Sequence, residues 1–295
     1  MSKIPFLQRL RAGEVLVSDG ATGTNLFARG LSRGQTPEHW VLEQPEQILQ
    51  LHCDFLAAGS DIILTSTFGA SSIRLRGSSL EGRAGEVNQR AAALALQATR
   101  DTSSLVGGSI GPLGQLLKPL GPLTVEEAFA SYAEQANALS EAGVDLLVIE
   151  TQFDLAEATA AIQAARSVSS LPIVASFSYD RGKKTMMGVS PTKAGAELSA
   201  LNVNVIGINC GRSLEENLSN LKDLRQTISL PIWFKPNAGL PRLDENNNPI
   251  YDLSPQQMGE QAVIWIEAGA QIVGGCCGTS PAHLRHIAQT VKNNR

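Results

Sequence analysis

The chain has 295 residues, of which 43% are hydrophobic and 18% are charged, a composition that is ordinary for a soluble globular enzyme. Its formal net charge of −4 argues against a nucleic-acid-binding protein and against binding to an anionic membrane surface. We find no signal-peptide pattern and no apolar run near the roughly 20 residues that a membrane helix needs. Four cysteines in a chain of this length do not indicate a disulfide scaffold, so we expect a cytoplasmic protein with reduced thiols.

Short apolar runs alternate with amphipathic stretches along the whole chain. Runs rich in Val, Ile and Leu without strict alternation predict parallel strands that are covered on both faces. These eight strands are expected at Val15–Ser18, Asp61–Thr65, Leu105–Ile110, Asp145–Glu150, Pro172–Phe177, Val203–Asn209, Pro231–Lys235 and Gln271–Gly274. Apolar residues at three- and four-residue spacing predict helices at Pro45–Ala58, Ala84–Arg100, Thr124–Ala142, Asp154–Ser167, Thr192–Leu201, Leu214–Thr227, Ser254–Ala268 and Pro281–Lys292.

Eight strands that are each followed by a helix predict the α/β class and a single (β/α)8 TIM barrel. The alternative is an open doubly wound sheet, but no Gly-x-Gly-x-x-Gly opens a helix after the first strand. No low-complexity linker divides the chain, so we expect one domain over residues 1–295. The polar connection Leu240–Pro249, with the run Asn246–Asn248, is either a mobile lid or an ordinary surface loop.

Three cysteines follow predicted strands and are surrounded by glycines. Cys210 follows Gly-Ile-Asn at the end of the sixth strand, and Cys276 and Cys277 follow Gly-Gly after the eighth. The active site of a TIM barrel lies at the carboxyl ends of its strands, and strands six and eight are next-nearest neighbours there. We therefore expect three thiolates to converge as zinc ligands. The fourth tetrahedral position would stay open for a substrate thiol that zinc activates.

Two alternatives for the cysteines stay open. One is that they are buried thiols that only pack, which does not explain why they gather at glycine-rich strand ends. The other is a structural zinc site, which needs a fourth protein ligand that the sequence does not offer. Cys53 lies within the predicted helix Pro45–Ala58 and is expected to be a packing residue.

Two carboxylates also lie at predicted strand ends. Glu150 ends the fourth strand and Asp19 follows the first, and both are suited to accept hydrogen bonds from a substrate ammonium group. The alternative is that each caps a turn, which suits Asp19 because Asp-Gly favours tight turns. The segment Gly20–Thr24 is expected to offer backbone N–H groups to a substrate carboxylate.

Lys235, at the end of the seventh strand, supports a different class of enzyme. A lysine at that position can form a Schiff base, as in class I aldolases. That interpretation leaves the three cysteines unexplained. The four histidines show no ligand pattern, so we expect them to be structural residues; they are His39, His52, His283 and His286.

The motifs Asp19–Thr24, Asn209-Cys210 and Gly274–Thr279 resemble the signature motifs of homocysteine S-methyltransferases, and the resemblance runs from about residue 10 to about residue 290. It implies a (β/α)8 barrel in which the three cysteines bind zinc, which activates the homocysteine thiol for methyl transfer to give methionine. The expected zinc ligands are Cys210, Cys276 and Cys277. The expected residues around the substrate are Asp19, Gly20, Ala21, Thr65, Ser66, Glu150 and Asn237.

Members of this family differ in their methyl donor, which is a methylcorrinoid, a sulfonium compound or betaine. The segments Lys235–Pro241 and Tyr251–Pro255 are similar to the homocysteine domain of cobalamin-dependent methionine synthase. That similarity implies methylcobalamin supplied by a partner protein or domain, with S-methylmethionine or S-adenosylmethionine as the alternative donors. It also implies that Asn237 lies near the metal and occupies its open position when substrate is absent.

The chain has none of the folate, corrinoid and reactivation modules of the long synthases. We therefore expect either an excised domain or a stand-alone protein that meets a corrinoid and methyltetrahydrofolate-binding partner. A further alternative is a non-catalytic subunit that only docks a corrinoid protein. No nucleic-acid or membrane partner is expected.

Overall fold

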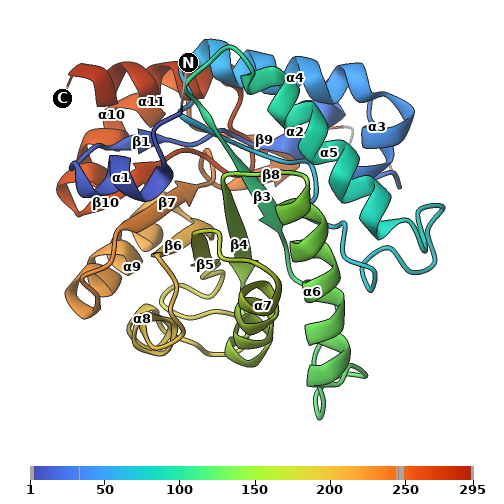
Figure 1. Ribbon diagram of the computed structural model, residues 1–295. Helices are drawn as coiled ribbons and strands as arrows, with labels where there is room; N and C mark the ends of the chain where they lie inside the picture. Colours follow the sequence, from blue (N-terminus) through green and yellow to red (C-terminus); the bar gives the residue numbers. More distant parts are fainter. Residues whose placement is uncertain (1–2, 33, 244, 246–248, 294–295) are drawn as a thin grey trace.

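The computed structural model describes residues 3–32, 34–243, 245 and 249–293. Within these ranges, eight parallel strands form a central sheet that helices surround (Figure 1). In sheet order the strands are β1 (Leu16–Val17), β10 (Ala270–Val273), β7 (Ile232–Pro236), β6 (Val205–Cys210), β5 (Ile173–Phe177), β4 (Leu146–Gln152), β3 (Leu105–Ile110) and β2 (Ile62–Leu64). A parallel bridge between Ser18 and Ile62 joins the two ends of this order. The sheet is therefore a closed barrel, and the predicted TIM-barrel fold is confirmed.

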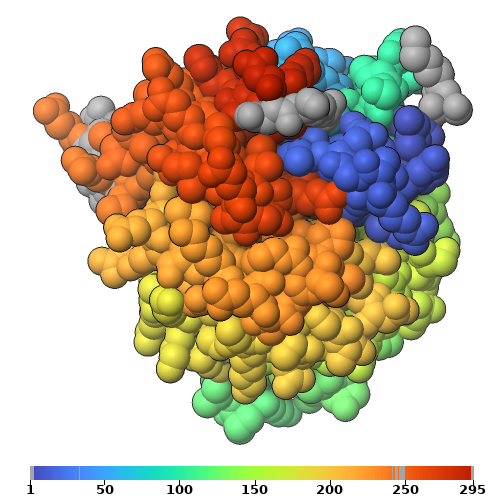
Figure 2. Space-filling view, turned by 90° about the vertical axis from the view of Figure 1, so that its left-hand side faces the viewer, coloured from blue at the N-terminus to red at the C-terminus, as the bar shows by residue number. Residues whose placement is uncertain are grey.

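The helices that the sequence predicts cover the outside of the barrel. They are α4 (Pro45–Ala58), α5 (Ala84–Thr99), α6 (Val125–Glu141), α7 (Leu155–Val168), α8 (Pro191–Ser199), α9 (Leu214–Thr227), α10 (Pro255–Glu267) and α11 (Pro281–Asn293). On the face drawn in Figure 2 the red C-terminal segment lies beside the blue N-terminal segment. This agrees with the direct pairing of β10 with β1, which brings the last strand to the first.

Local sequence signals fix several helix ends. The Thr124 hydroxyl accepts a hydrogen bond from the Glu127 backbone N–H at 3.1 Å, and the Glu127 carboxylate accepts one from the Thr124 N–H. This capping box begins α6 where the Thr-Val-Glu-Glu pattern predicts it. Gly59 ends α4 with a φ of +105°, a left-handed conformation that glycine adopts without steric cost.

Three short helices precede α4 and were not predicted: α1 (Phe6–Arg11), α2 (Thr22–Ala28) and α3 (Pro37–Glu43). Each has six or seven residues, which is too short to show a helical repeat of apolar residues. The second of them changes one expectation. The segment Gly20–Thr24 is not a simple glycine loop, because α2 begins at Thr22.

Side chains inside the barrel form a core that is separate from the one under the helices. The interior core contains Leu16, Val148, Val205 and Trp233, and the α1 residues Phe6 and Leu10 belong to it. Since α1 precedes β1, this short helix closes the amino-terminal end of the barrel. Polar residues occupy the opposite, carboxyl-terminal end of the barrel.

The connection between β7 and α10 contains an antiparallel hairpin of β8 (Pro241–Leu243) and β9 (Pro249–Tyr251). The predicted loop Leu240–Pro249 is therefore partly ordered as strands, whereas its run Asn246–Asn248 lies outside the described residues. None of the helices in the described ranges combines the length and the apolar character that crossing a membrane requires.

Candidate functional site

Because side chains alternate in direction along each strand, certain polar residues point into the barrel at its carboxyl end. Val148 on β4 and Trp233 on β7 belong to the interior core, so the residues two positions further along point to the same side. Those residues are Glu150 and Lys235, and both are buried. The apolar interior therefore ends in a layer of charged groups at the mouth of the barrel.

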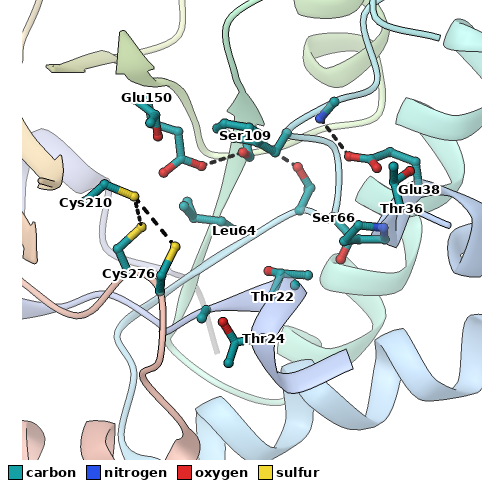
Figure 3. Close-up of a pocket in the computed structure, with 18 of the residues that line it drawn as sticks. Thr22, Thr24, Thr36, Glu38, Leu64, Ser66, Ser109, Glu150, Cys210 and Cys276 are labelled. Atoms are coloured by element: carbon teal, nitrogen blue, oxygen red, sulfur yellow. Dashed lines mark hydrogen bonds between the residues drawn. The ribbon is translucent and has the colours of Figure 1, made fainter. Parts of the chain in front are cut away.

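The three predicted cysteines converge in this layer. Their sulfur atoms all lie within 4.8 Å of one another, and all three thiols are free (Figure 3). The Cys210 sulfur is 2.9 Å from that of Cys276 and 3.8 Å from that of Cys277. Strands β6 and β10 flank β7 in the sheet, so the predicted next-nearest-neighbour arrangement brings the two cysteine motifs together.

Cys210 is held in an uncommon backbone conformation. Its φ is +56°, in the left-handed region that non-glycine residues rarely occupy, and Thr151 across the site has a φ of +61°. Asn209 connects the two: its Oδ1 accepts from the Thr151 N–H at 2.9 Å, and its Nδ2 donates to the Thr151 hydroxyl at 2.7 Å. Asn217 donates to the Cys210 carbonyl at 2.6 Å. The surroundings thus impose the conformation that aims the Cys210 thiol at the other two.

Asn237 ties the two cysteine loops to each other. Its Oδ1 accepts from the Cys277 backbone N–H at 3.0 Å, and its Nδ2 donates to the Gly211 carbonyl at 2.9 Å. The expectation that Asn237 lies near a metal site is consistent with this place. However, its amide is engaged by backbone groups here, so direct contact with substrate or metal stays a prediction.

Tyr251, on β9 of the hairpin, lies against the same loop. A Cβ added to Gly278 would overlap the Tyr251 ring, so only glycine leaves room for this contact. Tyr251 also contributes to lowering the pKa of the Cys277 thiol. The hairpin therefore covers one side of the cysteine cluster.

The cysteine cluster is suited to a divalent metal ion. Hydrogen bonds from Cys210 to the other two sulfurs, together with burial, raise the pKa of Cys210. Hydrogen bonds accepted from Cys210 and Cys276 lower the pKa of Cys277. The three thiols therefore do not ionise independently, and a bound cation would favour the ionised form of each. Sulfur ligands at about 2.3 Å from tetrahedral zinc lie about 3.8 Å apart, which fits the Cys210–Cys277 separation. The Cys210 and Cys276 sulfurs, at 2.9 Å, would have to move apart to bind the same ion.

A buried ion pair lies beside the cysteines. The Lys235 ammonium is 2.7 Å from Asp19 Oδ1, and Asp19 Oδ2 accepts from the Leu64 N–H at 2.8 Å. Burial alone would lower the pKa of Lys235, but the charges of Asp19 and Glu150 outweigh it and raise that pKa. A Schiff-base lysine must lose its proton, so this environment disfavours the aldolase alternative. Asp19 does not line the pocket, and its direct contact with a substrate ammonium stays a prediction.

Glu150 is the carboxylate that faces the pocket. Its Oε1 accepts a hydrogen bond from the Ser109 hydroxyl at 2.6 Å. Burial raises the pKa of Glu150 from 4.5 to about 7, and the positive charge of Lys235 opposes that rise. Near neutral pH this carboxylate therefore exchanges its proton readily, and an incoming cation would favour its ionised form.

A cavity of about 360 Å³ opens beside the cysteines. Figure 3 shows the cysteines and Glu150 on one side of it and Thr36 and Glu38 on the other. Its wall includes Gly20, Ala21, Thr65, Ser66, Glu150, Cys210, Lys235, Cys276 and Cys277. The structure thus brings together most of the predicted site residues at one cavity.

Individual hydroxyl groups on this wall differ in what they can offer. The Thr65 hydroxyl is engaged by Thr67 at 2.6 Å and by the Ser109 N–H at 3.0 Å. The Ser66 hydroxyl is buried and makes no protein hydrogen bond. The Ala21 N–H already donates to Thr279, so it is not available to a substrate carboxylate. Ser66 is therefore the better-placed donor among these three.

Several residues of the site have no role predicted from the sequence. Asn209 belongs to a predicted motif without a predicted role. Its side chain points into the barrel, as the alternation of residues along β6 predicts. Ser109 could have been found in the same way on β3. Glu38 and Arg74 line the cavity from segments outside the strand ends, so no strand-based signal identifies them. His39 also lies on this wall, but its Nδ1 accepts a hydrogen bond from the Thr36 N–H at the start of α3.

The profile of one protein family, described as homocysteine S-methyltransferase, matches residues 16–291. The chain belongs to this family. The matched span includes the whole barrel and all three clustered cysteines.

Two curated relatives are methionine synthases. That of Mycobacterium tuberculosis (strain ATCC 25618 / H37Rv) is 31% identical over 299 residues, and that of Mycobacterium leprae (strain TN) is 30% identical over 297 residues. Each alignment covers 95% of this chain but only 25% and 24% of the respective relative. The chain therefore spans about a quarter of the length of these synthases.

Solved structures agree with the fold. The metallated form of the homocysteine methyltransferase MmuM from Escherichia coli has a TM-score of 0.81 at 26% identity, covering 97% of this chain and 99% of that chain. A 3-dehydroquinate dehydratase from Geobacillus kaustophilus HTA426 has a TM-score of 0.53 at 11% identity, covering 95% of this chain and 92% of that chain. The second likeness concerns the barrel fold alone.

We predict that Asn209→Ala weakens metal binding by about 10- to 100-fold, because it releases Cys210 and Thr151 from their shared anchor. Zinc titration against a chromophoric chelator measures this. Asn204→Ala is the matched control, since Asn204 lies just before the start of the same strand, where its Oδ1 accepts from the Ile173 N–H. Equal zinc affinity in the two variants would show that Asn209 does not position the metal ligands.

Proposed function

We propose that this chain is a zinc-dependent S-methyltransferase domain that binds homocysteine and presents its sulfur for methylation to methionine. The observation that carries the proposal is the cluster of Cys210, Cys276 and Cys277 on the wall of a cavity, in a chain of the homocysteine S-methyltransferase family. Zinc held by these three sulfurs would supply charge that stabilises a substrate thiolate at neutral pH. We further propose that residues 1–295 act as a single homocysteine-binding domain.

The chain's own side chains can bind the amino-acid end of homocysteine. Glu150 faces the cavity with one carboxylate oxygen on Ser109, which leaves acceptor capacity for a substrate ammonium. The unpartnered Ser66 hydroxyl and the first residues of α2 offer donors for the substrate carboxylate. Lys235 balances the charges of Asp19 and Glu150 beneath the cavity. These groups fix one end of the substrate while its sulfur reaches the cysteine side.

The similarity of Lys235–Pro241 and Tyr251–Pro255 to the homocysteine domain of cobalamin-dependent methionine synthase supports a methylcorrinoid, carried by a partner protein or domain, as the methyl donor. The surface around the barrel mouth is compatible with such a partner, because large apolar side chains are exposed on the connections that follow the strands. Leu120 is 66% exposed, Met186 52% and Ile250 49%. Apolar groups exposed in this way commonly mark an interaction surface.

A small sulfonium donor is the second candidate. The extension of the cavity beyond the cysteines and Glu150 favours it, because that space can hold a second small molecule. The two donors are distinguished by offering zinc-loaded protein homocysteine with methylcobalamin or with S-methylmethionine and measuring methionine. Methionine from neither donor would contradict the proposed activity of this chain on its own.

We expect Cys276→Ser to lose stoichiometric zinc and methyl transfer together, because a serine hydroxyl does not replace a thiolate ligand at neutral pH. Metal analysis of the purified protein and a methionine assay measure the two losses. Cys53→Ser is the matched control, since Cys53 is a half-buried thiol on α4 outside the cluster. Full zinc content and normal turnover in Cys276→Ser would overturn the metal-site assignment.

Glu150→Gln should weaken homocysteine binding in a pH-dependent way. The amide keeps an acceptor for the Ser109 hydroxyl but carries no charge. Since the pKa of Glu150 is about 7, its carboxylate is ionised above that pH and protonated below it. The ratio of the variant's Kd to the wild-type Kd should therefore be largest at pH 8 and fall about tenfold by pH 6.

Calorimetric titration of both zinc-loaded proteins with homocysteine gives this ratio. Taking the ratio removes the pH dependence that comes from the substrate thiol, because both proteins share it. A ratio that stays constant from pH 6 to pH 8 would show that Glu150 does not pair with the substrate ammonium.

A further inference from the structure

The cavity has an outer lobe that the proposed homocysteine site does not use. We define this outer lobe by residues 36–39, 68–69, 74–75 and 78, which line the cavity from the α3 region and from the β2–α5 connection. Figure 3 shows Thr36 and Glu38 across the cavity from the cysteines. A second ligand in the outer lobe would therefore face the homocysteine sulfur.

Glu38 is a buried carboxylate in this lobe. It is 3% exposed, and its Oε1 accepts a hydrogen bond from the Gly69 backbone N–H at 2.7 Å. Within the described ranges, no lysine or arginine nitrogen lies within ion-pair distance of it. A neutral side chain such as glutamine could accept the same hydrogen bond from the Gly69 N–H. That bond therefore does not explain why a carboxylate is buried at this position. A charge placed in this way favours a cationic partner.

Arg74 supplies the opposite charge beside it. A Cβ added to Gly69 would lie 3.2 Å from Glu38 Oε1 and 3.5 Å from Arg74 Cγ, so both side chains lie against the same glycine. The Arg74 guanidinium packs beside Gly114, on the next strand connection. Across the described part of the chain, Arg74 has no carboxylate within 4.0 Å of its guanidinium. The Glu38 carboxylate and the Arg74 stem therefore lie against one glycine and line the same cavity without an ion pair, and the Arg74 guanidinium lies toward Gly114, where its charge also acts on Glu157.

We propose that Glu38 and Arg74 bind the ammonium and the carboxylate of an amino-acid methyl donor whose methyl group is carried by a sulfonium. The α-amino acid head presents one positive and one negative group side by side, which matches the two side chains. Its sulfonium end then extends toward the cysteines, where the homocysteine sulfur is held. This inference rests on the proposed function and names the substrate class of the second candidate donor.

The transfer balances without any further reactant. The homocysteine sulfur, having lost its proton to solvent, forms a bond to the donor methyl carbon while the donor's sulfur–methyl bond breaks. The donor sulfur keeps the bonding pair and leaves as a neutral thioether. With S-methylmethionine as the donor, both products are methionine.

The test compares donors with and without an amino-acid head in the zinc-loaded protein. S-methylmethionine carries the head, and trimethylsulfonium carries only the reactive cation. In Glu38→Gln, which keeps the acceptor for the Gly69 N–H, we expect the ratio of kcat/KM for S-methylmethionine to that for trimethylsulfonium to fall about 10- to 100-fold. Arg74→Met should lower the same ratio. Arg76→Met, an exposed arginine on the same connection, is the matched control and should leave the ratio unchanged.

Three outcomes would overturn this inference. One is an unchanged donor ratio in Glu38→Gln and Arg74→Met. Another is a rise in the KM for homocysteine in these variants as large as the rise in the KM for S-methylmethionine, which would place the amino-acid head of homocysteine in the outer lobe. The third is methylation by methylcobalamin with no use or binding of S-methylmethionine, in which case the proposed homocysteine chemistry stands and only the outer-lobe assignment fails.

Failure of the proposed function is recognised separately. If no donor yields methionine, calorimetric titration with S-methylmethionine still decides the outer-lobe assignment. Binding that weakens in Glu38→Gln but not in Arg76→Met supports the assignment, and the absence of binding to the wild-type protein contradicts it.

Discussion

The close approach of three cysteine sulfurs is the constraint on which the proposed metal site depends. If all three cysteines are ionised, sulfurs within 4.8 Å of one another repel strongly in a buried setting, so a zinc site here needs a backbone that fixes them and a cation that joins them. The closed barrel supplies the first condition, because β6 and β10 lie on either side of β7. Asn209 and Asn237 supply the rest, one by holding Cys210 in a left-handed conformation and the other by joining the two loops.

The charged residues beneath the cysteines also favour a bound cation. Asp19, Glu150 and the cluster place several potential negative charges around one fixed cation, Lys235. Lys235 in turn lies above the Trp233 ring, 5.5 Å from its centre, where the apolar interior of the barrel ends. A layer with this balance favours binding of further positive charge. A divalent metal ion and a substrate ammonium group both meet that preference, which links the two halves of the proposed homocysteine site.

The fold was predictable to the extent that its signals are local and repeated. Eight buried apolar runs, each followed by an amphipathic helix, predict the barrel, and the strand ends predict where Cys210, Cys276 and Cys277 meet. The short helix α2 was not predictable in this way, because a seven-residue segment that opens Thr-Gly-Thr has neither strong propensity nor a visible repeat.

Pairings between distant residues were beyond the reach of sequence patterns. Asp19 was expected to contact substrate, but in the structure its carboxylate pairs with Lys235, which lies 216 positions away. Nothing in the pattern around either residue specifies that partner. The outer lobe is a similar case, since Glu38 and Arg74 approach each other only because α3 folds against the β2–α5 connection that carries Gly69 and Arg74.

The most direct measurement of the central claim is X-ray absorption at the zinc edge of the loaded protein, with and without homocysteine. We expect zinc to have three sulfur ligands and one lighter ligand before homocysteine is added, and four sulfur ligands at saturation. A spectrum that keeps three sulfur ligands while calorimetry shows homocysteine bound would contradict it.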